Sequence, residues 1–402
     1  MDLVRGAGSA VTSRRHRLPA GLDRALDRAK WARRPGAADP PAAPPLVSPR
    51  TGAPARVLIG PANFAGQGRA WALALESAGV PAVSWAFTAD ATFGFGADHV
   101  APLGAVHRAS RAYQRAAFAA VVGAVEAVVI EAGRPLFGRL HGYDPVREAA
   151  ALADAGVRVA LLWHGTDVRV PSRHAATHAR SPFADADHAR RTRELESVAL
   201  RNRRRLARFD GPVLVSTPDL LEDLPGAQWC PVVVEPRRWA VAEPALRRAV
   251  PVVVHVPSNP WLKGSALVEP SVRSAEADGV VAYRAASGLP ADGVRELYRD
   301  ADVVLDQFRL GIYGVAACEA MAAGRLVVSD VDAGVRAAVR ARTGLDLPVR
   351  QAAAEQVGDV LRDAAGAGRA DASALARSGP GFVADVHDGR RSAHVLREAL
   401  GL

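Results

Sequence analysis

The chain has 402 residues, 49% of them hydrophobic, and a formal charge of +9 at neutral pH. That length suits two α/β domains better than a single core. Residues 1–50 carry ten basic and four acidic side chains, so +6 of the charge lies there and +3 in the rest. A nucleic-acid-binding domain needs a basic face with aromatic side chains on its folded part, and the sequence indicates neither, so we expect no nucleic-acid partner.

The cysteine content and the apolar runs exclude further classes of protein. Cys230 and Cys318 are the two cysteines and form no CxxC pair, which argues against a disulfide framework or a thiolate zinc site. The N-terminus lacks the apolar core of a signal peptide. The longest apolar stretch, 116–130, is interrupted by Glu126 and is too short to span a bilayer. We therefore expect a soluble, cytoplasmic protein.

Residues 1–54 are predicted to form a basic, Pro-rich, flexible tail, because 37–45 is a run of Ala and Pro and 49–54 continues it. One basic amphipathic helix is predicted between Leu18 and Arg34. Two interpretations of this segment stay open: a solvated arm, or a weak contact with the inner membrane surface. The thin apolar face favours the arm.

A first α/β domain is predicted over 55–240. The apolar run 56–60 ends in Gly, a Gly-rich turn follows, and a helical pattern covers 69–78, which is the opening of a nucleotide-type βα unit. Further strands are predicted at 81–85, 124–130, 157–163 and 212–216. Strands that alternate with helices predict a parallel sheet covered on both faces.

A second α/β domain is predicted over 241–402. Its expected strands are 252–256, 280–283, 302–305 and 326–329, and its expected helices are 265–277, 292–299, 314–323 and 334–342. A last helix is predicted at 387–400, after a break at Gly379-Pro380-Gly381. The fold class is therefore α/β, with two Rossmann-like domains whose parallel sheets face a cleft.

The strongest chemical signal lies in 301–329, which predicts a strand, a loop, a helix that begins near Gly314, and another strand. The helix N-terminus presents backbone N–H groups and the positive end of its dipole, which suits a phosphate. Glu319 lies about a turn and a half into the helix, among small and apolar residues. Its carboxylate could hold a diol such as a ribose, whereas the alternative is a solvated helix residue.

The pattern D-Q-x-x-x-G-x-Y-G-x-x-A-x-E-A-M-A resembles the donor-site signature of retaining GT-B glycosyltransferases of the large family 4 (group 1), in a bacterial branch. The resemblance extends from Ala55 to about Leu361. It implies a nucleotide-sugar donor, with Glu319 on the ribose hydroxyls. It also implies that Tyr313 and Gly314, at the helix start, meet the charge of the donor diphosphate without a metal ion.

The chain departs from this family at one position. Family members carry a first Glu eight residues before the second, on the transferred sugar, and here that position is Gly311. We expect Asp306, Gln307 or Arg309 to supply the missing contact.

A second signal is the segment 255–264, at the end of a predicted strand. Arginine has displaced lysine almost everywhere, yet Lys263 is retained in a turn, where a compact ammonium can meet a diphosphate. Chance placement of one of two lysines is the alternative. The resemblance assigns Lys263 to the donor diphosphate, and it leaves Ser258 and Asn259 to compensate for Pro257, where the family often has Arg.

A third signal follows the predicted strand 157–163, where open α/β sheets bind ligands. His164 could act as a general base or orient the sugar, and the resemblance assigns a histidine here to the sugar site. The alternative is a structural histidine, with Asp167 paired to Arg169. The Gly-rich turn resembles the family loop that approaches sugar and acceptor, which adds Gly66, Gln67 and Gly68 to the expected sugar and acceptor site, together with Asp167 beside His164.

Metal binding was considered for two Asp-x-Asp pairs. Asp185 and Asp187 lie in an irregular segment, and Asp330 and Asp332 follow the donor helix, where Asp332 is expected to cap the next helix. We therefore expect no metal and no cofactor besides the nucleotide-sugar co-substrate. The Arg-rich segment 190–208 is expected to be a solvated helix face.

The predicted function is a glycosyltransferase with an unknown glycan, lipid-linked or small-molecule acceptor. The alternative is a non-catalytic GT-B protein that binds a nucleotide-sugar, which Gly311 and Pro257 favour. A sugar-nucleotide epimerase would need further carboxylates in the cleft, and the sequence identifies none.

Overall fold

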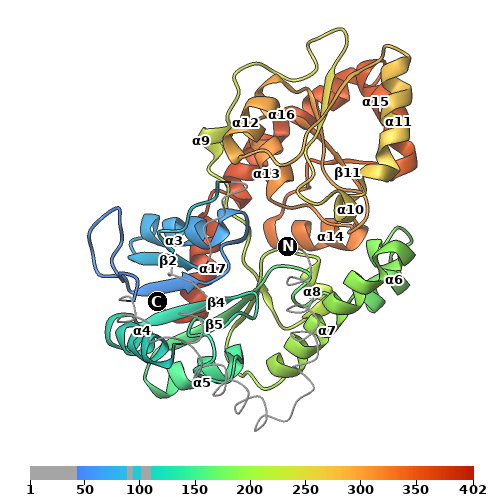
Figure 1. Cartoon of the computed structure of the whole chain (residues 1–402). Coiled ribbons are helices and arrows are strands. Elements are labelled where there is room, and N and C mark those ends of the chain that lie inside the picture. Colours follow the sequence, from blue (N-terminus) through green and yellow to red (C-terminus); the bar gives the residue numbers. More distant parts are fainter. Residues whose placement is uncertain (1–42, 88–93, 101–109) are drawn as a thin grey trace, which may run out of the picture. The chain divides into compact units, whose positions relative to one another are not determined.

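The computed structural model describes residues 43–87, 94–100 and 110–402. The basic helix expected between Leu18 and Arg34 lies outside the described residues. Within them, two parallel β-sheets follow one another along the chain (Figure 1). In these ranges no helix has both the length and the apolar character that crossing a membrane requires.

The first sheet has seven parallel strands among the described residues, in the order β3-β2-β1-β4-β5-β6-β7. They are β1 (Val57–Gly60), β2 (Ala82–Ala86), β3 (His99–Val100), β4 (Ala127–Glu131), β5 (Arg158–Trp163), β6 (Val213–Val215) and β7 (Gln228–Trp229). The central strands β1, β2 and β4 are buried along their whole length. Such strands read as continuous apolar runs rather than alternating patterns, and this is how the sequence revealed them.

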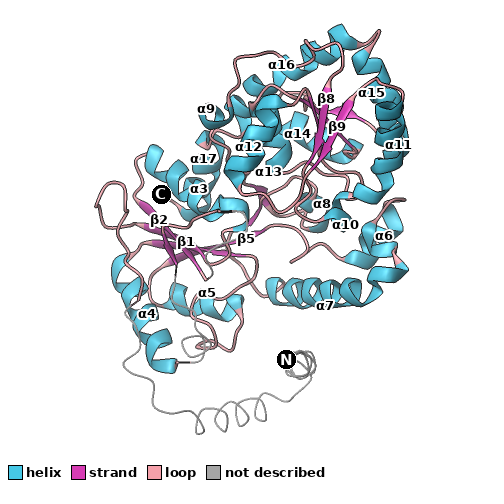
Figure 2. Ribbon diagram, turned by 45° about the horizontal axis from the view of Figure 1, so that its top comes forward, coloured by secondary structure: helices cyan, strands magenta, loops and turns pink. Residues whose placement is uncertain are grey.

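Helices line both faces of this sheet (Figure 2). Those that pack on its faces include α3 (Gln67–Ser77), α4 (Arg111–Ala124) and α5 (Pro145–Asp154). The helices that follow in the chain are α6 (Pro171–Thr177), α7 (Ala189–Leu206), α8 (Leu220–Asp223) and α9 (Pro236–Trp239). Alternate residues of β1 enter different cores, because successive strand side chains point to opposite faces. Leu58 packs in the cluster that includes α4 and α5, and Ile59 in the cluster that includes Trp71 of α3.

The described part of the predicted tail, residues 43–54, packs on the first half of the chain. Val47 and Pro54 form an antiparallel bridge, and Trp85 donates its indole N–H to Pro45 O at 3.3 Å. Arg50 donates to Asp98 Oδ1 at 2.6 Å. The packed structure therefore begins before the predicted boundary at Ala55.

The second sheet has the order β12-β11-β10-β8-β9, again parallel. Its strands are β8 (Val252–His255), β9 (Ala282–Ala285), β10 (Val303–Leu305), β11 (Leu326–Ser329) and β12 (Arg350–Gln351). The helices after β8 in the sequence are α10 (Pro260–Lys263), α11 (Ser265–Ala277), α12 (Ala291–Asp300), α13 (Val315–Ala322), α14 (Ala333–Thr343), α15 (Val357–Ala365), α16 (Arg369–Val386) and α17 (Arg390–Leu400). The predicted α/β fold with two parallel sheets is confirmed.

The expected break at Gly379-Pro380-Gly381 is wrong, because α16 continues through it. The glycine has a packing role instead: a Cβ at Gly379 would lie 2.7 Å from Met321 O of α13. A backbone that approaches another helix so closely requires glycine at the contact. Gly379 thus marks a helix contact, whereas a Cβ at Gly381 would meet nothing within 4 Å.

The last helix, α17, differs from the predicted domain division. We expected it in the second domain, yet it packs against α3 and β5 of the first half (Figure 1). Leu396 and Leu400 are fully buried in the same cluster as Ile59 and Trp71. The first half is therefore completed by the last helix in the sequence.

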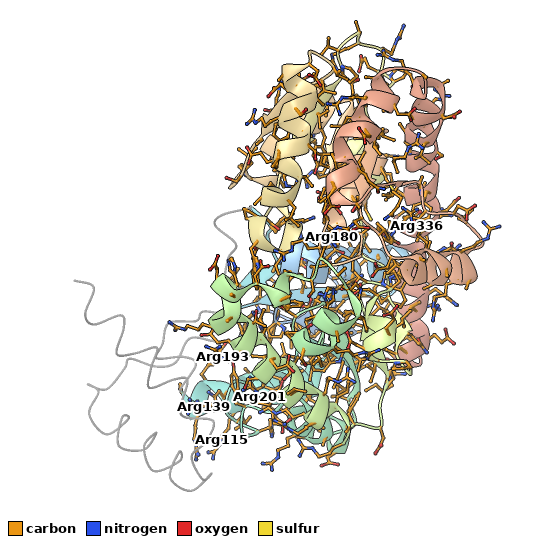
Figure 3. All side chains as sticks on the ribbon, turned by 90° about the vertical axis from the view of Figure 1, so that its right-hand side faces the viewer. Arg115, Arg139, Arg180, Arg193, Arg201 and Arg336 are labelled. Carbon is orange, nitrogen blue, oxygen red and sulfur yellow. The ribbon has the colours of Figure 1, made fainter. Side chains whose placement is uncertain are left out.

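The Arg-rich segment forms the 18-residue helix α7. Leu195 and Ala199 face inward, while Arg190 and Arg193 are exposed. Figure 3 shows Arg193 and Arg201 on the outer side of this helix. This agrees with the predicted solvated face.

Candidate functional site

The Lys263 ammonium lies at the C-terminal edge of the second sheet, at the end of α10. The helix is capped at its start by Asn259, whose Oδ1 accepts from Leu262 N at 3.2 Å, and it ends at Gly264 with φ +77°. Lys263 Nζ forms an ion pair with Asp306 Oδ1, directly after β10. Asp306 is 3% exposed, and its Oδ2 accepts no hydrogen bond from a described residue. Ser258 is exposed in the loop before α10.

Glu319 is buried in α13, as expected for a carboxylate that interrupts a packed face. Burial raises the pKa of Glu319 to about 8, against the opposing effect of Arg238 and Lys263. Its carboxyl accepts no hydrogen bond from the residues that the structure describes. Burial thus favours the neutral form of Glu319, which stays 9% exposed and can bond a ligand.

The two residues that open the donor helix play different parts. Gly314 is the N-cap of α13, and a Cβ there would meet nothing within 4 Å, so the helix start borders open space. The side chain of Tyr313 is 2% exposed, and its hydroxyl lies 3.2 Å from His387 Nε2. Its ring also packs edge-on near Phe382. Only the backbone of Tyr313 remains for a donor.

Gln307, another expected donor contact, supports the loop after β10. Its Oε1 accepts from Arg309 N at 3.1 Å and from Leu310 N at 3.0 Å. Its buried Nε2 donates to no described residue. The amide therefore has one donor available for a ligand.

On the first half, His164 lies at the end of β5 and contacts the loop after β1. Its ring centroid is 5.2 Å from that of Phe64 and 5.6 Å from that of Trp71. Asp167 accepts from His164 N at 3.0 Å and from Gly165 N at 2.7 Å, and so shapes the turn. The alternative pairing with Arg169 is wrong, because Arg169 forms its ion pair with Asp219.

Sequence reasoning missed Glu131, the last residue of the buried strand β4. It is fully buried, and its Oε2 accepts from Ala62 N and Asn63 N, both at 3.2 Å. Its Oε1 lies 3.2 Å from His164 Nε2, without hydrogen-bond geometry. A carboxylate at the end of an apolar run was the signal available in the sequence.

The Gly-rich turn is positioned by contacts that fix its residue types. Gly66 has φ +73°, and a Cβ at Gly68 would lie 2.9 Å from Glu131 Oε2. Gln67 differs from the expectation, because its amide bonds Val233 O at 3.0 Å and Val233 N at 2.6 Å. Gln67 thus joins α3 to the segment before α9 instead of facing an acceptor.

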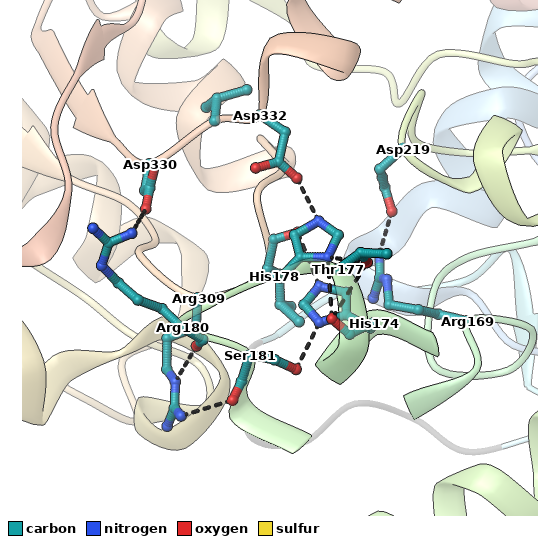
Figure 4. A network of polar contacts seen from close by, with 12 residues as sticks. Arg169, His174, Thr177, His178, Arg180, Ser181, Asp219, Arg309, Asp330 and Asp332 are labelled. Carbon is teal, nitrogen blue, oxygen red and sulfur yellow. Dashed lines mark hydrogen bonds and ion pairs between the residues drawn. The ribbon is translucent and has the colours of Figure 1, made fainter. Parts of the chain in front are cut away.

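Polar contacts link the loops at the edges of the two sheets (Figure 4). Arg309 bonds both oxygens of Asp185, at 2.6 and 2.7 Å, and donates to the carbonyls of Arg180 and Ser181. Arg180 pairs with Asp330 at 3.2 Å. The Arg309 guanidinium is therefore committed to structural contacts. Of the three residues expected to compensate for Gly311, Asp306 and Gln307 keep a polar atom that has no partner among the described residues.

Asp332 occupies the N-cap position of α14, but its side chain makes no capping bond, contrary to expectation. It lies 2.5 Å from His178 Nε2, and the hydrogen bond between them raises the pKa of His178. Sequence reasoning had not connected these residues, which are 154 positions apart. Within the described ranges no group of three or more His, Cys, Asp or Glu side chains is arranged to hold a metal ion.

No protein-family model matches the sequence, and no curated protein matches it. The fold, however, is that of the GT-B glycosyltransferases: two α/β halves, each with a parallel sheet. HepE from Anabaena, solved with UDP, has a TM-score of 0.54 at 12% identity, over 86% of this chain and 100% of that chain. The catalytic domain of starch synthase IV from Arabidopsis thaliana has a TM-score of 0.53 at 10% identity, over 86% and 98%. Sucrose-phosphate synthase from Thermosynechococcus elongatus has a TM-score of 0.51 at 14% identity, over 86% and 95%.

Proposed function

We propose that the chain is a glycosyltransferase that moves a sugar from a nucleotide-sugar donor to an acceptor. The observation that carries the proposal is the cluster of Lys263, Asp306 and Glu319 at the edge of the second sheet. It combines a cation with the buried carboxyl of Glu319 and with Asp306 Oδ2, a buried oxygen that accepts no hydrogen bond from a described residue. Supporting it, HepE and starch synthase IV, which share the fold, were solved with UDP-glucose and with ADP.

In the proposed donor site, Lys263 and the N-terminus of α13 meet the diphosphate, and Glu319 bonds the ribose. Burial keeps the Glu319 carboxyl protonated at pH 7, so it adds no negative charge beside the diphosphate. A neutral carboxyl can also donate one hydrogen bond and accept another, which suits a diol. Asp306 holds the Lys263 ammonium in place until the donor arrives.

The proposed reaction transfers a hexose with retention and without a metal ion. The cationic Lys263 and the helix dipole stabilise the departing diphosphate. His164 contacts the sugar from the other half, oriented by the Asp167 turn and by Glu131 beneath it. The acceptor, a glycan, a lipid-linked molecule or a small molecule, binds the first half near the Gly-rich turn.

A non-catalytic nucleotide-sugar binder is the second candidate. It is favoured by the ion pair that already occupies Lys263, and by the lack of a side chain at Gly311. A binder requires Lys263 far more than His164, whereas an enzyme requires both, since bond breaking needs charge stabilisation and placement of the sugar.

Paired measurements of nucleotide binding and of turnover distinguish the two candidate functions. Calorimetry with UDP, GDP, ADP and dTDP identifies the base, and transfer or slow donor hydrolysis is followed with the matching sugars. Lys263→Ala should weaken both binding and turnover. His164→Ala should leave nucleotide affinity unchanged but lower turnover at least tenfold, about 1.4 kcal/mol of barrier.

Arg273→Ala on the exposed face of α11 serves as the control and should change neither quantity. Tight nucleotide binding with no turnover of any donor supports the binder. No binding of any nucleotide overturns both candidates. Activity that EDTA abolishes and that Mg²⁺ or Mn²⁺ restores overturns the metal-free mechanism.

We also propose that the protein works in the cytoplasm and that the basic tail contacts the inner membrane surface when the acceptor is lipid-linked. Removal of residues 1–42 should then reduce binding to vesicles of anionic lipid and leave nucleotide affinity unchanged. Equal vesicle binding by the full chain and the shortened chain contradicts the membrane contact.

A further inference from the structure

A cavity of about 310 Å³ lies between the end of α6 and the loops after β10 and β11. Most of its lining is polar or charged: Thr177, His178, Arg180, Glu222, Arg309, Asp330 and Asp332. Phe308 supplies an apolar wall. A pocket with many hydrogen-bonding groups and one aromatic face suits a polyhydroxylated ring better than an apolar ligand.

At Gly311 the space for a side chain is already taken. Gly311 has φ +67°, and a Cβ there would overlap Asp332 Oδ2. Asp332 N also donates to Gly311 O at 2.9 Å. The loops after β10 and β11 are thereby fixed so that the carboxylate of Asp332 stands where a residue at 311 would project.

One oxygen of this carboxylate is held and the other is available. Oδ2 lies 2.5 Å from His178 Nε2. The His178 ring stacks on the His174 ring, with 3.9 Å between the ring centroids. His174 is itself bonded to Ser181 Oγ at 2.7 Å (Figure 4). Asp332 Oδ1 accepts no hydrogen bond from a described residue, and the side chain is 38% exposed.

Three other charged groups of the cavity, Arg309, Arg180 and Asp330, are paired with each other or with further residues, whereas Glu222 is exposed and no described residue anchors its carboxylate by an ion pair. Arg309 is bonded to Asp185, while Asp330 bonds Arg180 at 3.2 Å and Gln351 at 2.7 Å. Asp332 is therefore a carboxylate of this cavity that is both anchored and open to a ligand.

The cavity adjoins the proposed diphosphate site. Phe308 N donates to Lys263 O at 3.0 Å, and a Cβ at Gly264 would lie 2.8 Å from Arg309 Cγ. The wall of the cavity is thus packed directly on the Lys263-Gly264 turn. A donor with its diphosphate at Lys263 has its sugar beside this wall.

We propose that Asp332 is a specificity-determining residue, whose outer oxygen accepts hydrogen bonds from ring hydroxyls of the transferred sugar. The inference rests on the proposed function. His178 acts as a positioning residue that keeps the carboxylate turned toward the cavity from the other half of the chain. A carboxylate that only accepts hydrogen bonds distinguishes a hydroxyl from a hydrogen, and one hydroxyl orientation from its epimer.

The test compares Asp332→Asn with the wild-type chain, using Kd for UDP, UDP-glucose, UDP-galactose and UDP-N-acetylglucosamine, with the GDP and ADP sugars in parallel. The quantity of interest is the ratio of Kd for each nucleotide-sugar to Kd for its nucleotide. Asp332→Asn should raise this ratio about tenfold or more for the preferred nucleotide-sugar, which corresponds to the loss of a hydrogen bond to a charged group. The discrimination between epimers should narrow, while Kd for the nucleotide stays within about twofold.

Asp359→Asn on α15, where the side chain is 85% exposed, is the matched control and should leave every ratio unchanged. His178→Gln should narrow the discrimination in the same direction, because the carboxylate loses its anchor. Melting curves check that each variant folds, and Asp332→Glu replaces the Asn variant if that one does not.

Unchanged sugar discrimination in a folded Asp332 variant that still binds nucleotide overturns the inference and leaves the proposed function intact. Failure of the wild-type chain to bind any nucleotide in the panel overturns the proposed function itself, and the inference with it. Because the readout is binding, the test decides the inference even where the second candidate function holds.

Discussion

At the residue scale, the buried carboxyl of Glu319 links stability to pH. Burial raises its pKa to about 8 from 4.5, so the folded chain retains a proton that the unfolded chain releases. Stability then falls as pH rises from 4.5 toward 8, because the unfolded state binds fewer protons in that range. A group that costs stability at neutral pH and accepts no hydrogen bond within the described chain is consistent with a role in binding.

Glu319→Gln tests the link between stability and pH, and Glu319→Ala tests the ribose contact, because the Gln amide also donates and accepts hydrogen bonds. The melting temperature of Glu319→Gln relative to the wild type should increase between pH 5 and pH 8, since the amide removes the ionisation penalty. The affinity of Glu319→Ala for the nucleotide should fall by about 1–3 kcal/mol. Melting curves across pH and calorimetry at pH 7 check the two expectations, and an Ala variant that binds nucleotide as well as the wild type rules out the ribose contact.

His178 differs from Glu319 because its charged form is the one that the fold stabilises. Its hydrogen bond with Asp332 raises the pKa above 6.5, with Glu222 adding in the same direction, while burial acts to lower it. The stacked His174 is neutral, because burial lowers its pKa to about 3. The protonated His178 is thus stabilised by carboxylates and faces no charged imidazole.

The contribution of this pair to stability should be full below pH 6.5 and lost as pH rises through the raised pKa of His178. The difference in melting temperature between the wild type and His178→Gln should therefore shrink from pH 6 to pH 9. A difference that stays constant over this range would mean that packing, and not the charge of His178, stabilises the contact.

At the scale of elements, the apolar runs of the sequence predicted the central strands of both sheets closely. The expected strand 326–329 and the expected helix 265–277 match β11 and α11 at both ends. The short edge strands β3, β7 and β12 were missed, because two residues carry no measurable pattern. The helix α16 was missed at its proline, where local propensity was overridden by packing on α13.

The two glycines that flank Pro380 offer a matched pair within α16. Gly379→Ala should destabilise the chain by about 1–3 kcal/mol, because its Cβ would lie 2.7 Å from Met321 O. Gly381→Ala meets nothing within 4 Å and should be neutral or stabilising by up to about 1 kcal/mol. Denaturant unfolding of the two variants measures the difference, and equal effects would show that helix propensity alone governs this segment.

Part of the candidate site can be predicted from local sequence. His164, Lys263 and Glu319 are singled out because each is a polar residue beside apolar residues of its own segment. Glu131, His178 and Asp332 act through partners that are distant in sequence, 154 positions apart for the last two. Such pairings depend on how two loops meet in space, and no local pattern encodes that.

At the scale of the whole described chain, α17 ties the last residues to the first sheet. Leu396 is fully buried in the core that it shares with β1 and α3. Leu396→Ala should cost about 2–5 kcal/mol, whereas Arg397→Ala, on the exposed side of the same helix, should stay within about 0.5 kcal/mol.

Hydrogen exchange locates the effect of Leu396→Ala. Protection should fall in β1 and α3, more than 300 positions earlier in the chain, because these elements share a core with α17. Loss of protection confined to the second sheet would contradict this assignment of the helix.

The return of α17 to the first sheet has a consequence for synthesis. Residues 57–229 supply all the strands of the first sheet, yet its core is closed only when Leu400 has left the ribosome. At about 5–20 residues per second, the roughly 170 residues in between take about 8–35 s to make. During that interval the apolar surface of Trp71 and Ile59 that α17 covers has no intramolecular partner, so the nascent chain offers a natural binding surface for a chaperone.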